Sequence, residues 1–234
     1  MSDSQLKINE IFLSIQGEGT RAGRPCVLIR LTGCNLNCAW CDTRYAATEG
    51  ELMPIGDVLK TVRQFGCKLV ELTGGEPLCQ PGAAELLTLL CDEGFQTLVE
   101  TNGSIDISGI DSRVIRIVDF KCPSSGESDS ICQTNAERLT PRDEVKFVIA
   151  DRTDYEFALR FTRANSLTEK CTVIFSPVAT ELPAAKLAEW ILFDSVDNTD
   201  SADSAKSAKS ADSLDIRLGL QLHKIIWPDK DRGV

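Results

Sequence analysis

Residues 68–100 read KLVELTGGEPLCQPGAAELLTLLCDEGFQTLVE, and this stretch decides the fold. It opens and closes with short apolar runs, 68–72 and 96–100, of the kind that form buried strands. Between them, residues 81–93 begin with a proline, carry leucines at helical spacing and stop at Gly94. This order of strand, helix and strand predicts a parallel sheet with its helices packed outside.

The same alternation continues on both sides of this stretch. Further strands are expected at residues 26–31, 114–120, 145–149, 172–175 and 216–221, and further helices at 55–65, 154–164 and 183–193. We therefore expect an α/β fold with a largely parallel sheet. In such sheets ligands bind at the C-terminal ends of the strands, where the loops converge.

The chain has 234 residues, of which 42% are hydrophobic, and this suits one folded domain. One segment departs from the pattern. Residues 194–215 are almost entirely Ser, Ala, Asp and Lys, so they offer no apolar face to bury. We interpret the chain as a single domain, 1–234, that carries this segment as an insertion.

The net charge of −10 argues against binding to nucleic acid or to an anionic membrane, since both depend on excess Lys and Arg. The first residues are polar, and no apolar run approaches the ~18 residues needed to cross a bilayer. We therefore expect a cytoplasmic protein, in which thiols stay reduced. Its ten cysteines then indicate metal binding, catalysis or burial rather than disulfides.

Three of the cysteines lie close together in GCNLNCAWCDT, residues 33–43, just after an expected strand. Thiolates at Cys34, Cys38 and Cys41 suit a 4Fe-4S cluster, and the iron left open could chelate S-adenosylmethionine (SAM). A structural zinc site is one alternative, although it needs a fourth ligand that is not obvious. A redox Cys-x-x-Cys pair and incidental buried cysteines are the others.

The spacing Cys-x3-Cys-x2-Cys, with an aromatic residue before the last cysteine, resembles the radical SAM superfamily. A second signature agrees with it, LTGGEP at residues 72–77, at the end of an expected strand. Glycines at this turn allow the backbone to come close to a ligand.

More specifically, the chain resembles the 7-carboxy-7-deazaguanine synthase family. The resemblance rests on Arg30 and on four motifs: IFLSIQGEG at 11–19, ETNG at 100–103, DFKCP at 119–123 and LQLHK at 220–224. It covers nearly the whole chain outside the insertion. It implies a shortened, partly open (β/α) barrel, usually paired as a homodimer. It also implies conversion of 6-carboxy-5,6,7,8-tetrahydropterin to 7-carboxy-7-deazaguanine and ammonia.

The resemblance also implies roles for individual residues, with the radical carried by the cofactor and no catalytic side chain assigned. Cys34, Cys38 and Cys41 would hold the cluster, and Thr43 would bind Mg²⁺. The residues expected to contact the pterin are Ile15, Gln16, Gly17, Glu18, Arg30, Thr73 and His223. Those expected to bind SAM are Gly75, Glu76, Asp119, Phe120, Lys121, Phe175, Ser176, Pro177 and Val178.

These roles fit the chemistry of the groups. The amino-oxo edge of a pterin suits an amide and a carboxylate such as Gln16 and Glu18. Its carboxylate suits the two-pronged guanidinium of Arg30. Magnesium prefers oxygen ligands and takes few of them from protein, so one threonine hydroxyl is enough.

The motifs depart from the family at two places. Asp119-Phe120-Lys121 stands where some relatives have Ser-Pro-Lys, and Phe175-Ser176 stands where many have Leu-Gln. The alternative functions are a radical-activating enzyme, which makes a glycyl radical on a partner protein, and a non-catalytic metal-binding scaffold. For the synthase we expect an electron donor such as flavodoxin or ferredoxin as partner.

Overall fold

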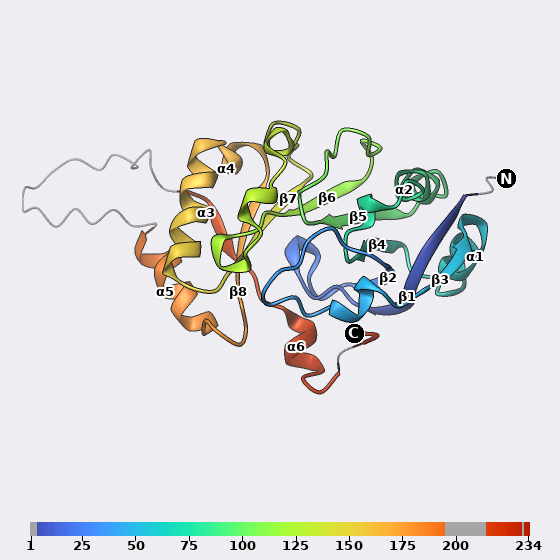
Figure 1. Ribbon diagram of the computed structural model, residues 1–234, viewed down its shortest axis with the longest axis horizontal. Coiled ribbons are helices and arrows are strands. Elements are labelled where there is room, and N and C mark those ends of the chain that lie inside the picture. The colour runs from blue at the N-terminus through green and yellow to red at the C-terminus, as the bar shows by residue number, and fades with distance from the viewer. Residues whose placement is uncertain (1–3, 195–213, 231) are drawn as a thin grey trace, which may run out of the picture.

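A computed structural model describes residues 4–194, 214–230 and 232–234 (Figure 1). Most of the predicted insertion at 194–215 lies outside the described residues. Within them, no helix is long and apolar enough to cross a membrane.

The protein is built on one nine-stranded sheet, in the order β3-β1-β2-β4-β5-β6-β7-β8-β9. The seven strands β2, β4, β5, β6, β7, β8 and β9 pair in parallel in this order, whereas β1 is antiparallel to both of its neighbours, β2 and β3. The strands are β1 Gln5–Ile15, β2 Pro25–Leu31, β3 Glu51–Pro54, β4 Leu69–Gly74, β5 Gln96–Thr101, β6 Ile115–Asp119, β7 Glu144–Ile149, β8 Thr172–Pro177 and β9 Ile216–Leu218. Because β3 and β9 remain edges, the sheet does not close, which confirms the expected partly open barrel.

Helices follow most of the parallel strands, and all but the last pack into the main core on one face of the sheet; the last lies over the opposite face (Figure 1). They are α1 Ile55–Gln64, α2 Ala83–Asp92, α3 Arg152–Ala164, α4 Leu167–Lys170, α5 Ala184–Asp194 and α6 Leu222–Ile226. Every predicted strand has an observed counterpart, and so do the four predicted helices. Their ends differ by a few residues, as is usual where helices and strands fray.

Four of these strands and helices were not predicted: β1, β3, α4 and α6. β1 was not predicted because a bulge interrupts the alternation of its side chains between the two faces of the sheet. β3 was not predicted because it is a short edge strand with mostly exposed residues. The strand expected at 216–221 ends at Leu218, which corrects that prediction. Gly219 lies against Ser176, where a side chain would collide with the serine hydroxyl. The chain turns there and forms α6.

The two faces of the sheet carry different kinds of side chain. Alternate residues such as Val27, Ile29 and Leu31 on β2 pack with the helices into the main core. The residues between them point to the opposite, inner face. There a small apolar cluster fills the N-terminal half of the strands: Cys26, Leu28, Leu69, Leu98, Ile115 and Ile117. Above this cluster, toward the C-terminal ends, the inner face is polar.

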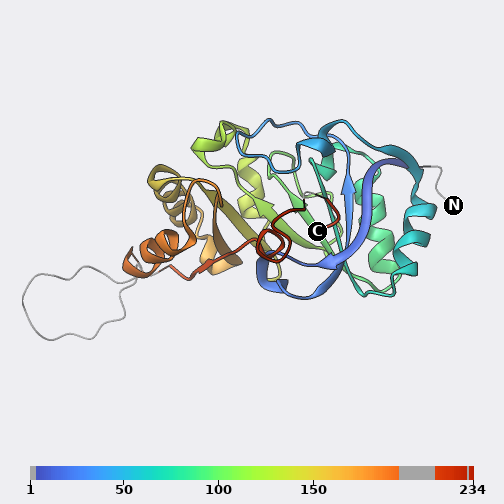
Figure 2. The same cartoon turned by 90° about the horizontal axis from the view of Figure 1, so that it is seen from below.

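The two ends of the described chain meet over this polar face. The amide of Leu222 donates to the carbonyl of Gly17 (2.9 Å), which joins the start of α6 to the turn after β1. Figure 2 shows the C-terminal segment lying across the sheet beside this turn. The inner face is therefore covered by residues far apart in sequence.

Candidate active site

The loop after β2, residues 33–43, crosses the C-terminal edge of the sheet. Hydrogen bonds that it donates to a neighbouring loop hold its backbone in place. The amide of Asn37 donates to Glu127 Oε1 (2.8 Å), and the amide of Ala39 donates to the carbonyl of Ser125 (3.0 Å). The loop thus has a defined shape although it lies at the surface.

All three cysteines of the predicted cluster lie on this loop. Cys34 and Cys41 are exposed and Cys38 is half-buried. The described residues contain no group of three or more His, Cys, Asp or Glu placed to hold one metal ion. A cubane instead spreads its thiolates over separate irons, so three thiols along one loop suit it.

The glycine turn after β4 lies directly against the cysteine loop. A Cβ atom on Gly75 would lie 2.8 Å from Cys34 Cβ and still closer to the carbonyl oxygen of Gly33. The amide of Glu76 donates to the same Gly33 carbonyl (2.8 Å). Only glycine fits at position 75, because the two loops touch through their backbones.

Glu76 is fully buried, and both of its carboxylate oxygens are occupied. They accept hydrogen bonds from the Thr101 hydroxyl (2.9 Å), the Asn102 amide (2.6 Å) and the Leu78 amide (3.0 Å). The Asn102 side chain in turn donates to Asn35 Oδ1 on the cysteine loop (3.1 Å). Glu76 therefore joins the end of β5 to the glycine turn.

The residues after β6 divide between the site and the core. Asp119 and Lys121 form an ion pair (2.8 Å). Burial raises the pKa of the Cys38 thiol, and the Lys121 ammonium acts against this rise, so the pair lies near the cysteine loop. Phe120 is fully buried, and its ring packs at a tilt against that of Phe161, with the ring centroids 4.9 Å apart. Any cofactor contact of Phe120 at this edge would come from its backbone.

The end of β8 divides in the same way. Phe175 is fully buried in the main core, in edge contact with Phe147 and Tyr155. Ser176 points to the inner face beneath Gly219. Pro177 and Val178, which follow, are both buried. A cofactor at this end of β8 would therefore meet mainly backbone atoms.

The residues expected to bind the pterin lie on β1 and the turn after it, on β2, on β4 and at the start of α6. Arg30 and Thr73 are direct neighbours in the parallel pairing of β2 with β4. A Cβ on Gly17 would lie 2.5 Å from His223 Nδ1, so the two ends of the chain touch there. The first residue of the group, Ile15, is the last residue of β1.

Glu18 stands at the centre of this group. Its Oε1 accepts from Gln221 Nε2 (2.9 Å) and its Oε2 from Lys146 Nζ (2.9 Å). Burial by itself would raise the pKa of Glu18, but Lys146 and Gln221 outweigh it and leave the pKa lowered. Burial also lowers the pKa of His223. At neutral pH the site thus combines an ionised Glu18 with a neutral His223.

Three charged residues of the inner face were not predicted as site residues, although Glu100 stands in the ETNG motif: Glu71, Glu100 and Lys146. Lys146 is an ion-pair hub that contacts Glu18 and Glu100 and lies 3.7 Å from Asp119. Its side chain is only 7% exposed. Each of the three is a charged residue in a mainly apolar strand, as Arg30 is, and Lys146 shares its strand with Glu144. That signal could have found them, because such charges are rarely buried without partners.

Glu71 has no cationic hydrogen-bond partner among the described residues; its carboxylate accepts from the Gln16 side-chain amide. Burial and the nearby Glu100 raise its pKa to about 8. The folded chain therefore holds a proton that the unfolded chain releases as the pH rises above about 4.5. The free energy of unfolding should fall with rising pH between about 5 and 8.

Replacing Glu71 by Gln should remove this contribution. Glutamine can still accept from Gln16, but it does not titrate, so up to ~1.4 kcal/mol per pH unit of the slope should disappear. Denaturant titrations at several pH values between 5 and 8 measure it. Glu93→Gln, at a surface ion pair with Arg63, is the matched control. Equal slopes in the wild type and the Glu71 variant would contradict the assignment.

Fold and site together define a class. An open, mostly parallel α/β sheet with three cysteines after one strand and a glycine turn after the next is typical of radical SAM proteins. The family model of the Radical SAM superfamily matches residues 28–122. This class uses a 4Fe-4S cluster and SAM.

The relatives identify the family within this class. The chain is 42% identical to a 7-carboxy-7-deazaguanine synthase of Koribacter versatilis, over 98% of this chain and 100% of the relative. It is 40% identical to that of Chlorobaculum tepidum, over 100% and 99%. The chain therefore belongs to the 7-carboxy-7-deazaguanine synthase family. The crystal structure of QueE from Escherichia coli shares the fold, with a TM-score of 0.69 at 22% identity over 93% of this chain and 94% of that one.

Proposed function

We propose that this protein is a 7-carboxy-7-deazaguanine synthase. It converts 6-carboxy-5,6,7,8-tetrahydropterin to 7-carboxy-7-deazaguanine with release of ammonia. The observation that carries the proposal is the meeting of Gly17 and Glu18 with Gln221 and His223 over the polar inner face. These contacts support an enclosed small-molecule site at the edge that carries the cysteine loop.

In this proposal Cys34, Cys38 and Cys41 hold the 4Fe-4S cluster. Gly75, Glu76, Asp119, Lys121 and the backbone of 175–178 would bind SAM at the C-terminal ends of the strands. When bound and reduced, the cluster and SAM supply a radical that abstracts hydrogen from the substrate. The chain itself brings two backbones into contact at Gly75 and holds Lys121 beside the cysteine loop.

The remaining groups suit the pterin. Glu18, ionised through Lys146, accepts hydrogen bonds from the amino edge of the ring, and Gln16 lies beside it. Arg30 uses only Nε within the described part of the chain, so its two Nη groups are available for the substrate carboxylate. Thr73 and His223 are the other two side chains proposed to contact the pterin. These contacts orient the ring toward the cysteine loop and exclude water from it.

One experiment tests the proposal directly. The anaerobically reconstituted protein is incubated with dithionite, SAM, Mg²⁺ and 6-carboxy-5,6,7,8-tetrahydropterin, and the product is followed by absorbance and mass spectrometry. Formation of 7-carboxy-7-deazaguanine together with ammonia is the expected result. SAM cleavage without any change in the pterin would show a different radical SAM activity. A protein that binds iron but cleaves no SAM would be a scaffold.

We also propose that Thr43 binds Mg²⁺ at the substrate. Its hydroxyl is half-buried and lies 3.8 Å from Cys41 Sγ, so it is close to the cluster ligands. Thr43→Ala should raise the Mg²⁺ concentration needed for half-maximal turnover about tenfold, since one oxygen ligand is lost. Iron content should stay unchanged. Equal Mg²⁺ dependence in Thr43→Ala and Thr43→Ser would contradict the role.

Four further properties belong to the proposal. All ten cysteines are free, which supports a reducing compartment such as the cytoplasm. Apolar side chains are exposed on β9, α6 and the residues between them: Leu218, Leu220, Ile225 and Ile226. They support a homodimer, which sedimentation would test. The exposed Cys34 and Cys41 leave the cluster open to an electron donor such as flavodoxin or ferredoxin. The chain, 1–234, works as one domain with its insertion.

A further inference from the structure

A β-bulge decides which residue of β1 faces Arg30. In the antiparallel pairing of β1 with β2, Ile8 lies opposite Leu31 and Glu10 opposite Arg30, so Asn9 is the extra residue. With regular pairing Asn9 would stand opposite Arg30. The bulge therefore places a carboxylate beside the guanidinium.

Glu10 is held from three sides. Its Oε1 accepts hydrogen bonds from Arg30 Nε (2.8 Å) and from the Tyr45 hydroxyl (3.0 Å). Its Oε2 accepts from the amide of Gly233 (3.2 Å). Burial raises the pKa of Tyr45 to about 12, so its hydroxyl stays a donor at neutral pH. Glu10 has little freedom to leave Arg30.

The guanidinium of Arg30 is fixed by more than this ion pair. Its central carbon lies 5.9 Å from the centre of the Phe12 ring and 6.0 Å from that of Tyr45. The Arg30 side chain is only 10% exposed. Glu10 bonds to Nε, and neither Nη group makes a hydrogen bond to any described residue. One edge of the fork is thus anchored and the other is free.

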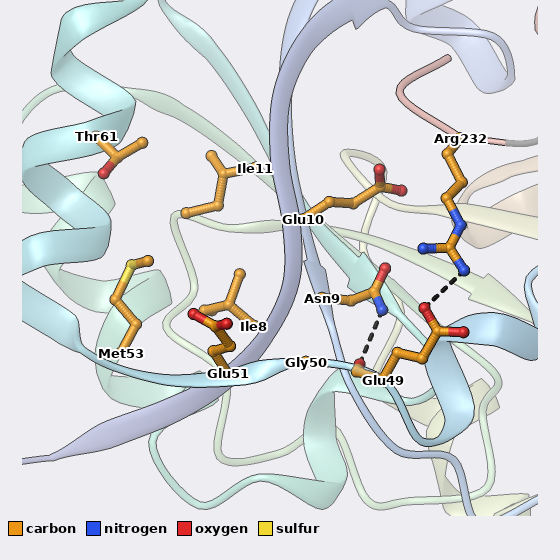
Figure 3. Close-up of a pocket in the computed structure, with 10 residues that line it drawn as sticks. All are labelled: Ile8, Asn9, Glu10, Ile11, Glu49, Gly50, Glu51, Met53, Thr61 and Arg232. Carbon is orange, nitrogen blue, oxygen red and sulfur yellow. Dashed lines mark hydrogen bonds and ion pairs between the residues drawn. The ribbon is translucent and has the colours of Figure 1, made fainter.

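Tyr45 is supported in turn from its other side. Arg232 lies over its ring at 4.2 Å and pairs with Glu49 (2.7 Å). Figure 3 shows Glu10 and Arg232 on the wall of an open cavity of about 440 Å³. No residue expected to contact the pterin lines that cavity. Glu49 and Arg232, which support Tyr45, therefore line this cavity together with Glu10.

We propose that Glu10 is a positioning residue for the substrate carboxylate: with the Tyr45 hydroxyl it fixes the Arg30 guanidinium so that both Nη groups are free for the ligand. This inference rests on the proposed function. Because Tyr45 follows the cysteine loop, the same contacts tie the substrate anchor to the loop that carries the cluster. The role of Glu10 is orientation, since its charge by itself would repel the substrate carboxylate.

The first test separates binding from turnover. Glu10→Ala should raise KM for the carboxypterin about fivefold or more, with kcat and uncoupled SAM cleavage by dithionite nearly unchanged. Glu10→Gln keeps an oxygen that accepts from Arg30 Nε, so its KM should stay close to that of the wild type. Tyr45→Phe removes only the hydroxyl and should give a smaller rise. Glu93→Gln, at a surface ion pair, is the control.

The second test asks whether Glu10 acts through Arg30. Arg30→Ala alone should weaken binding about ten- to a hundredfold, because a charge-assisted contact is lost. Adding Glu10→Ala to Arg30→Ala should then change KM less than about twofold. Losses that multiply in the double variant would overturn the proposal, and so would a Tyr45→Phe variant with the KM of the wild type. If Glu10→Ala does not fold, the same comparison of KM is made with Tyr45→Phe, alone and in combination with Arg30→Ala.

Failure of the proposed function looks different. If the wild type does not convert the carboxypterin, or if Arg30→Ala converts it as well as the wild type does, then the substrate assignment is wrong. If Arg30→Ala is impaired but Glu10 and Tyr45 variants are not, only the positioning role is wrong.

Discussion

Replacing any one of Cys34, Cys38 or Cys41 by Ala is expected to abolish the cluster and all turnover. Anaerobically reconstituted wild type should hold about four irons and four sulfides per chain. Each thiolate binds a separate iron, so two remaining thiols cannot hold a cubane. No other cysteine belongs to this loop. Iron and sulfide analysis, with the visible absorbance of the reconstituted protein, measures the loss.

Cys67→Ala is the matched control for these variants. Cys67 is half-buried, and its thiol donates to the carbonyl of Pro25 (3.3 Å) at the N-terminal end of β2. That is the end of the sheet opposite the cysteine loop. The control should keep the full iron content. A cysteine-loop variant that still loads four irons, or a wild type that takes up zinc in place of iron, would refute the cluster assignment.

The second large effect is expected for Lys146→Met. The ammonium of Lys146 neutralises Glu18 and Glu100 and lies close to Asp119, all on the inner face. Removing one partner of a buried ion pair leaves uncompensated charge and typically costs about 3–5 kcal/mol of unfolding free energy. Methionine has a similar length, so lost packing contributes little. Urea denaturation under anaerobic conditions measures the difference.

Two further variants test whether this loss of stability comes from unpaired buried charge. Arg113 also pairs with two acidic residues, Asp92 and Asp111, but at the surface. Arg113→Met should therefore hardly change the denaturation midpoint. Adding Glu100→Gln to Lys146→Met removes one unpaired charge and should recover part of the stability. Lys146→Met with the stability of the wild type would show that the inner carboxylates need no cation.

The fold could be predicted from the sequence because helices and parallel strands bury continuous apolar runs. Residues 68–100 illustrate this, since β4, α2 and β5 lie where the spacing of apolar residues puts them. β1 could not be predicted in the same way. Its pairing depends on a bulge at Asn9 and on a partner strand, and neither leaves a local signal.

The site could be predicted in part. Motifs gave the cysteines, the glycine turn and the residues at both ends of the chain, and the structure brings these together. They did not show that Phe120 and Phe175 turn into the core, because strand alternation decides that. Nor did the motifs reveal Lys146. Its role depends on three carboxylates that the fold places beside it: Glu18 in the turn after β1, Glu100 on β5 and Asp119 on β6.

The contact between Gln221 and Glu18 spans 203 positions of the chain, and it has a consequence for biosynthesis. During translation the segment with β2, the cysteine loop and β4 leaves the ribosome early, and domains begin to fold as they emerge. Residues 221–223 follow much later. The cysteine loop can therefore take shape while the polypeptide is still growing, whereas the contacts of Glu18 and Gly17 with residues 221–223 form only after that later segment has emerged.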